Sequence, residues 1–144
     1  MKDVKVNSAL LLIRMMVGFV FIFEGIQKFL FPDVLGVGRF IKIGLPAAEF
    51  FGYFVPIFEI ACGALVLIGL LARLASIPLV IIMLVAIIST KIPILINDGF
   101  WKMAHEARTD WAMLLGSIFF LIIGAGKWSL DSILHNKKSK NENN

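Results

Sequence analysis

Residues 51–96 read FGYFVPIFEIACGALVLIGLLARLASIPLVIIMLVAIISTKIPILI, an apolar block that only three charged residues interrupt. A single helix of this length would be about twice as long as a bilayer is thick. We therefore expect a hairpin of two membrane spans. Its turn is predicted at Leu71-Ala72-Arg73, where the only charge is that of the arginine, and Pro78 is expected in the first turn of the second helix.

The composition of the whole chain agrees with an integral membrane protein. Of its 144 residues, 59% are hydrophobic, and the mean hydropathy of +0.90 is far above that of an ordinary soluble domain. The net charge is +4, but the basic residues flank the apolar segments, so we expect the lipid bilayer and no nucleic acid as partner. Cys62 is the only cysteine, which excludes a dithiol relay within the chain.

The predicted fold class is all-α, an integral membrane four-helix bundle with a short interfacial helix between spans one and two. A transmembrane helix needs about 20 mostly apolar residues. The N-terminal apolar segment is too long for a signal peptide and lacks a small-x-small cleavage site, so it counts as a retained span. The four predicted spans are residues 8–31, 51–71, 74–96 and 111–127.

The segments outside the spans are short. In GVGRFIKIGLP, residues 36–46, the apolar positions share one helical face, which predicts an amphipathic helix at the membrane interface. A plain loop fits this length equally well. Residues 1–134 are expected to form a single transmembrane domain. The polar tail HNKKSKNENN, residues 135–144, lacks apolar anchors and is predicted to be disordered.

Four spans place both termini on one side of the membrane. That side would carry seven lysines and arginines and the other side six, a small margin in favour of cytoplasmic termini under the positive-inside rule. We therefore predict a multi-pass protein of the cell membrane with both termini in the cytoplasm. Trp101 and Trp111 would then mark the outer interface and Trp128 the inner one.

Motifs for bound cofactors and metals are missing from the sequence. LGVGRFIKIG begins like G-x-G-x-x-G, but Ile41 stands in the third glycine position and no βαβ pattern surrounds it. His105 and His135 fall on opposite sides of the predicted membrane, so they cannot ligate one haem or one metal within a single chain. We therefore predict no metal site.

Charged side chains inside the spans are the informative feature. Each costs ~2.5–3.5 kcal/mol at the bilayer centre on insertion scales, and such residues often mark a functional site. Counted from the span ends, Glu24, Lys28, Glu59 and Lys91 all fall in the outer half of the membrane. They could form a neutral four-member network in which both carboxylates stay ionised. If the carboxylates instead lacked cations, the pKa of one would rise and the site would hold a proton; the sequence leaves both states open. The alternatives are an i,i+4 helical pair for Glu24 and Lys28, and snorkelling anchors for the two lysines.

Arg14 lies six residues into the first predicted span from the inner side. Its long side chain could snorkel to that interface, and Asp131 beyond the fourth span is a candidate partner. Four glycines are expected to permit close helix packing near these charged residues. They are Gly18, Gly25, Gly63 and Gly69.

The order and spacing of these residues resemble the DoxX family of small four-span membrane proteins, over about residues 8–134. The resemblance rests on Arg14 followed by EGIQK at residues 24–28, on Glu59 with Gly63, on GLLAR at residues 69–73 and on GKWSLD at residues 126–131. Relatives often carry a histidine near the end of span three, where this chain has Lys91. That departure speaks against a role that needs an imidazole there.

The resemblance implies a membrane oxidoreductase, or the membrane subunit of one, that works with quinone or with a soluble redox partner protein. In that role Glu24 and Glu59 would be the catalytic groups that take up and release protons. Lys28 and Lys91 would bind the quinone and stabilise a developing quinol anion, and Arg14 is a further cofactor-binding candidate.

No intrinsic electron carrier is visible in the sequence, so a bound quinone or a partner protein would have to supply the electrons. The alternative function is a small proton-coupled carrier, or an accessory scaffold subunit without catalysis of its own. A homo-oligomer is compatible with each of these functions.

Overall fold

The computed structural model describes residues 2–135, and within this range the protein is helical and contains no strand. The prediction of a disordered tail falls, apart from residue 135, outside the described residues. A π-helical turn, η1, continues α4 directly into α5. In chain order the elements are α1 (Lys2–Leu30), α2 (Val37–Lys42), α3 (Ala48–Ile68), α4 (Ala72–Ala86), η1 (Ile87–Lys91), α5 (Ile92–Asp98), α6 (Phe100–Glu106) and α7 (Arg108–Ile123).

Among the described residues, three helical segments are long and apolar enough to cross a membrane: Val4–Leu30, Ala48–Ile68 and Ala72–Asp98. They coincide with the first three predicted spans. The fourth predicted span corresponds to α7, which has only 16 residues and a length of about 24 Å against a hydrocarbon core of about 30 Å. The fourth span and the four-helix bundle therefore stay predictions.

The turn between the second and third spans begins two residues earlier than predicted. Gly69 adopts a left-handed conformation (φ 73°), and the N–H groups of Gly69 and Leu70 bond back to the carbonyl of Leu65. This arrangement ends α3 because glycine takes a positive φ without a steric penalty. Ala72 consequently starts α4, and Pro78 lies inside that helix and not in its first turn, which corrects the sequence prediction.

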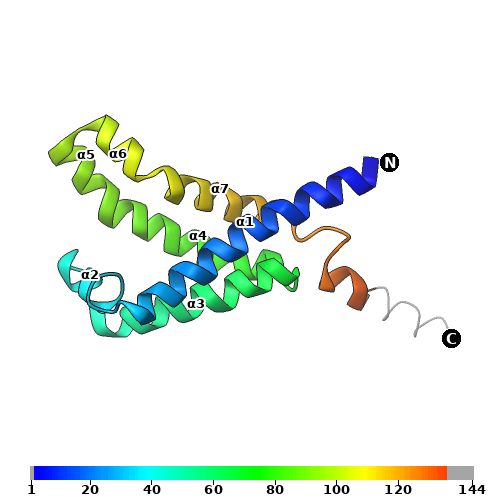
Figure 1. Cartoon of the computed structure of the whole chain (residues 1–144), viewed down its shortest axis with the longest axis horizontal. Coiled ribbons are helices and arrows are strands. Elements are labelled where there is room, and N and C mark those ends of the chain that lie inside the picture. Colours follow the sequence, from blue (N-terminus) through cyan, green and yellow to red (C-terminus); the bar gives the residue numbers. More distant parts are fainter. Residues whose placement is uncertain (1, 136–144) are drawn as a thin grey trace.

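Two closely packed helix pairs make up the body of the protein (Figure 1): α1 packs mainly on α3, and α4 mainly on α7. Glycines bring α1 and α3 together, as predicted. A Cβ atom at Gly25 would lie 2.7 Å from the carbonyl oxygen of Pro56, and one at Gly18 would lie 2.9 Å from that of Gly63. Such a close approach is possible only without side chains at these positions.

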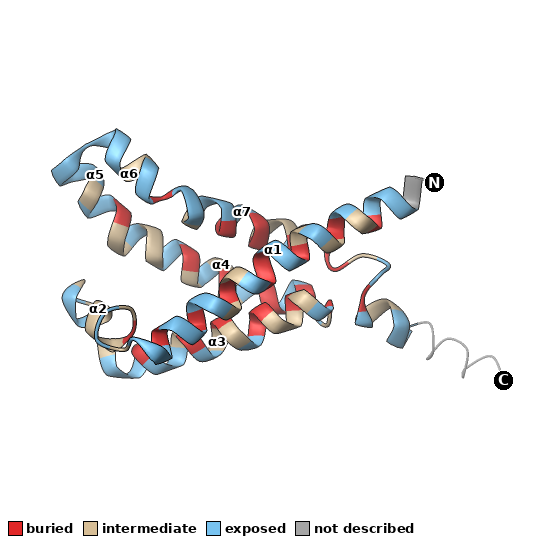
Figure 2. Cartoon of the chain, in the orientation of Figure 1, coloured by how far each residue is buried: buried red, intermediate tan, exposed pale blue. Residues whose placement is uncertain are grey.

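The start of α1 and the last described residues lie at the same end of the molecule, and α2, α5 and α6 lie at the other end (Figure 1). Buried residues form stripes where the helices face one another, and the outward faces are exposed (Figure 2). Large apolar side chains are abundant on these outward faces, among them Leu12, Phe19 and Leu115. A surface of this kind suits lipid contact and not water.

The segment between the first two spans contains the short helix α2, as predicted, and not only a loop. Val37 packs against Gly52 of α3, where a side chain would leave no room for it. Ile41, which the pattern placed on the same apolar face, is exposed. The position of α2 at a membrane interface stays a prediction.

Candidate functional site

A pocket of about 680 Å³ lies between the two helix pairs, toward the end that holds α2 and α6. Most of its lining is aliphatic and aromatic, with Phe51, Phe54 and Phe58 on α3 and Ile81 and Ile82 on α4. Charged side chains from both helix pairs also line it. They are Glu24, Lys28, Arg39, Glu59, Lys91, Glu106 and Asp110.

A buried ion pair forms the α1–α3 wall of the pocket. Lys28 Nζ donates to both carboxylate oxygens of Glu59, at 2.8 and 2.7 Å. Only 2% of the Glu59 side chain and 10% of the Lys28 side chain are exposed. Gly25, one turn before Lys28 on α1, lets α3 approach so closely that Glu59 comes within reach of the ammonium group. Breaking such a pair would leave a buried, uncompensated charge.

Glu24 belongs to the same wall but is far less shielded. Its carboxylate lies 3.6 Å from Lys28 Nζ, and 49% of its side chain is exposed. Glu24 precedes Gly25 in the chain and so lies about 100° around α1 from the face that packs on α3. Glu24 and Glu59, both predicted in the outer half of the membrane, therefore differ strongly in burial.

Lys91 lies on the opposite wall, at the last position of the π-helical turn η1. Its Nζ atom is 3.1 Å from a carboxylate oxygen of Asp110 in the first turn of α7. The structure thus pairs Lys91 with Asp110, and it brings Glu24, Lys28 and Glu59 together on the other wall. Asp110 was not among the residues predicted for this network. Its signal was available, because Asp110 directly precedes the fourth predicted span, on the side where span three ends five residues after Lys91.

Arg14 lies at the other end of the α1–α3 pair, about 20 Å along α1 from Lys28. Its guanidinium donates hydrogen bonds to the carbonyls of Val66 (3.1 Å), Leu67 (2.7 Å) and Trp128 (2.5 Å), with a longer contact of 3.5 Å to Ala125. These bonds connect α1 to the carboxyl end of α3, where a cation is favourable, and to the segment that follows α7.

Asp131, the predicted partner of Arg14, interacts electrostatically with the guanidinium and also has a hydrogen bond of its own. Asp131 accepts a hydrogen bond from the backbone N–H of Leu71, at 3.1 Å, in the turn before α4. Arg14 thus directs its donors to backbone carbonyls and is not among the residues that line the pocket.

The remaining candidate ligands lie apart from one another. Cys62 is buried in the core as a free thiol. His105 is exposed on α6, where it contacts Arg108, and His135 is exposed at the end of the described chain. Within residues 2–135, no three His, Cys, Asp or Glu side chains are grouped so that they could hold a metal ion.

These features define a helical membrane protein with a largely apolar pocket whose walls carry lysine–carboxylate pairs. The DoxX family model matches residues 9–92, a range that contains Arg14, Glu24, Lys28, Glu59 and Lys91. The chain belongs to the DoxX family.

Two relatives extend this comparison. The chain is 56% identical over 125 residues to "Uncharacterized membrane protein Rv3486" of Mycobacterium tuberculosis, a match that covers 83% of this chain and 77% of the relative. It is 31% identical over 136 residues to "Putative oxidoreductase CatD" of Bacillus subtilis, covering 92% of this chain and 91% of that protein. No solved structure gives a significant match to the chain.

Proposed function

We propose that this protein is the membrane subunit of a quinone-linked oxidoreductase and that its pocket binds the quinone head group. The observation that carries the proposal is the buried Lys28–Glu59 pair in the wall of an otherwise apolar pocket. Ionisable residues within membrane spans are costly and usually serve a site. The name of the relative from Bacillus subtilis supports redox chemistry.

The pocket suits a flat, lipid-soluble ring with polar oxygens. Its volume of about 680 Å³ falls in the range of roughly 300–1,000 Å³ that is usual for small-molecule sites. The phenylalanines of α3 and the isoleucines of α4 provide apolar contacts for the ring and for an attached hydrocarbon chain. The lysine ammonium groups provide hydrogen-bond donors for its oxygens.

The residues of the pocket can supply the proton chemistry of such a reaction. Reduction of a quinone to a quinol consumes two electrons and two protons, and in this proposal a soluble redox partner protein supplies the electrons. Lys28 donates a hydrogen bond to one ring oxygen, and Glu59 holds the ammonium group in place through both carboxylate oxygens. Glu24, half exposed beside Lys28, connects this ammonium group to solvent protons.

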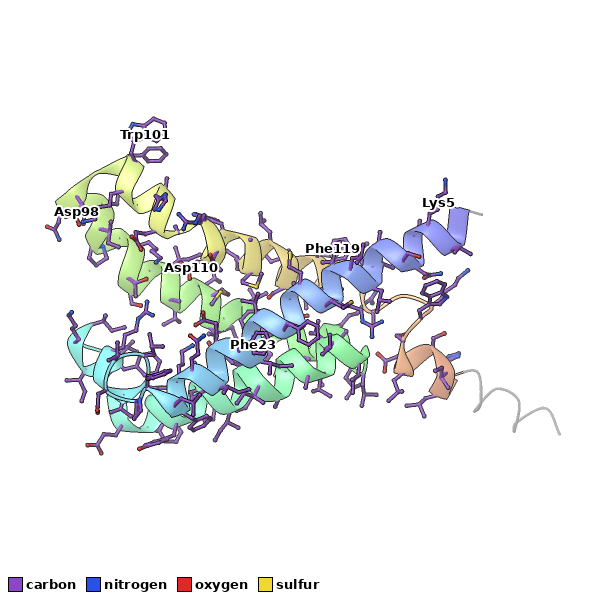
Figure 3. The ribbon with its side chains drawn as sticks, viewed as in Figure 1. Lys5, Phe23, Asp98, Trp101, Asp110 and Phe119 are labelled. Carbon is purple, nitrogen blue, oxygen red and sulfur yellow. The ribbon has the colours of Figure 1, made fainter. Side chains whose placement is uncertain are left out.

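The proposed arrangement in the membrane has four spans, with α7 as the fourth, and both termini in the cytoplasm. The pocket then lies in the outer half of the bilayer, and α2 lies at the outer interface. Trp101 at the tip of α6 points away from the body of the protein (Figure 3), as expected for an interfacial aromatic residue.

Quinone binding tests the proposal. The protein is placed in lipid nanodiscs, and the quenching of its tryptophan fluorescence by duroquinone is measured against protein-free nanodiscs. We expect saturable quenching, and an affinity at least about tenfold lower in Lys28→Met/Glu59→Gln, because the variant lacks the charge-assisted donor. This double variant leaves no unpaired buried charge.

The matched control is Asp98→Asn/Lys102→Gln, which removes an exposed ion pair whose two residues are absent from the pocket lining. Its affinity should equal that of the wild type. Unsaturable quenching in the wild type, or equal affinity in both double variants, would contradict the proposal. Proton-coupled uptake into proteoliposomes without quinone binding would instead favour a carrier.

A further inference from the structure

We propose that Lys91 and Asp110 form a second polar subsite of the pocket, which holds the ring oxygen at the end opposite Lys28 and Glu59. This inference rests on the proposed function and narrows its ligand to rings with two oxygens on opposite sides. We call the Lys28–Glu59 pair the first subsite and the Lys91–Asp110 pair the second subsite.

The local backbone at Lys91 is unusual. Residues Ile87–Lys91 form a π-helical turn in an otherwise α-helical span. Such turns are rare and frequently occur at functional sites. The hydroxyls of Ser89 and Thr90 donate to the carbonyls of Val85 (2.7 Å) and Ala86 (2.6 Å), which gives partners to backbone oxygens at the widened turn. The turn brings Lys91 into the pocket lining, where it is buried.

The second subsite repeats the chemistry of the first on the opposite wall. Each is a buried lysine in contact with a carboxylate: Lys28 with Glu59 at 2.7 Å and Lys91 with Asp110 at 3.1 Å. Asp110 lies on α7 beside α4, across the pocket from α1 and α3 (Figure 3). A ring between the walls would meet an ammonium donor at each end.

The two lysines also resemble each other in their access to water. Beside Lys28 lies Glu24, whose side chain is 49% exposed, and beside Lys91 lies Asp110, whose side chain is 23% exposed. Each lysine therefore lies beside a carboxylate that is partly exposed to solvent: Glu24 for Lys28 and Asp110 for Lys91. Arg39 and Glu106 are the other charged groups of the lining.

This arrangement supplies one proton at each end of the ring. In the reduction, an O–H bond forms at each of the two ring oxygens, and the two carbonyl double bonds become single bonds. The two electrons come from the soluble redox partner protein named in the proposed function. Lys28 gives one proton and Lys91 the other, and each lysine regains a proton from water by way of Glu24 or Asp110.

Two symmetric probes that differ by one hydroxyl group separate this subsite from a structural ion pair. Durohydroquinone carries two opposite hydroxyls on a tetramethyl ring, and durenol carries one. Binding of both is measured by fluorescence quenching in nanodiscs, for the wild type and for Lys91→Met/Asp110→Asn. The wild type should bind durohydroquinone at least about tenfold more tightly than durenol, because only the former is held at both ends.

In Lys91→Met/Asp110→Asn, the affinity for durohydroquinone should fall to that for durenol. Durenol itself should lose less than about threefold, since one hydroxyl can still use the first subsite. A purely structural pair would weaken both probes alike. The single variant Asp110→Glu keeps both the lysine and a carboxylate. It should therefore discriminate between the two probes better than Lys91→Met/Asp110→Asn does, which provides a test even if the double variant fails to fold.

Three results would overturn the inference: no discrimination between the probes by the wild type, an equal loss for both probes in the variant, or no loss for either. If one of these results is found and the Lys28→Met/Glu59→Gln variant still has a lower affinity for duroquinone than the wild type, the proposed function stands without the second subsite. If the wild type binds none of the ring compounds, both proposals are wrong.

Discussion

The two ends of the α1–α3 pair bury cations in different ways. At the end near the termini, Arg14 is surrounded by backbone carbonyls from α3 and from the segment after α7. At the pocket end, Lys28 contacts the carboxylate of Glu59 and lines a cavity. Lys91 does the same with Asp110 on the opposite wall of that cavity. Carbonyls cannot take up or release protons, whereas carboxylates can. The comparison therefore distinguishes Arg14, which holds chain segments together, from Lys28 and Lys91, which are placed to bind a ligand and exchange protons with it.

The largest effect on stability is expected when Lys28 alone is lost. Lys28→Met leaves Glu59 buried without its cation and should lower the free energy of unfolding by about 3–5 kcal/mol, measured by denaturant titration in mixed micelles. Lys28→Met/Glu59→Gln should recover more than half of this loss.

The control for this prediction is Asp98→Asn. Asp98 forms an exposed i,i+4 ion pair with Lys102, in which Asp98 Oδ1 lies 3.0 Å from Lys102 Nζ. It should change the free energy of unfolding by less than about 0.5 kcal/mol. Equal stability of Lys28→Met and the wild type would mean that the Lys28–Glu59 pair is not buried in the protein.

A smaller effect on stability, with no effect on the ligand, is expected at Arg14. Arg14→Lys keeps the charge but replaces a planar fork of donors by a single ammonium group, so some of the carbonyls lose their partner. We expect a loss of about 2–3 kcal/mol in the free energy of unfolding, from one or two unsatisfied carbonyls. Duroquinone affinity per folded molecule should stay within about twofold of the wild type. A tenfold loss of affinity at unchanged stability would instead assign Arg14 to the binding site, the role that the family resemblance implied.

The smallest of the three effects concerns Gly25, which sets the distance between α1 and α3. A Cβ atom there would lie 2.7 Å from the carbonyl oxygen of Pro56, so Gly25→Ala should cost about 1–3 kcal/mol in the free energy of unfolding. It should also weaken duroquinone binding, because Lys28 and Glu59 would be pushed apart. Ala61→Val on the exposed side of α3 is the matched control and should cost less than about 0.7 kcal/mol. Equal costs for the two variants would show that the helices are not in close contact at Gly25.

The sequence predicts the parts of the structure that depend on local composition. Apolar segments of sufficient length identify three spans, and the i,i+4 spacing of Glu24 and Lys28 identifies their ion pair. The depth of Glu59 in its span indicated a buried acid that a partner must neutralise. These predictions rest on hydrophobicity and helical periodicity alone, and both are properties of single segments.

The rest depends on how segments meet, which one sequence does not reveal. Asp110 pairs with Lys91 only because α7 packs on α4. The carbonyls of α3 that accept from Arg14 are available because the helix ends at Gly69. Every residue has a backbone carbonyl, so the sequence of side chains does not show which carbonyls will bind the arginine. The π-helical turn before Lys91 has no simple sequence pattern and changes which way the lysine faces.

Photolabelling with an azidoquinone, followed by mass spectrometry of the labelled peptides, tests the central claim most directly. If the pocket holds the ring, label should appear on α3 between Phe54 and Glu59 and on the η1 segment near Lys91, and excess duroquinone should suppress it. Label confined to outward faces such as those of Leu12 and Leu115, unaffected by duroquinone, would contradict the account.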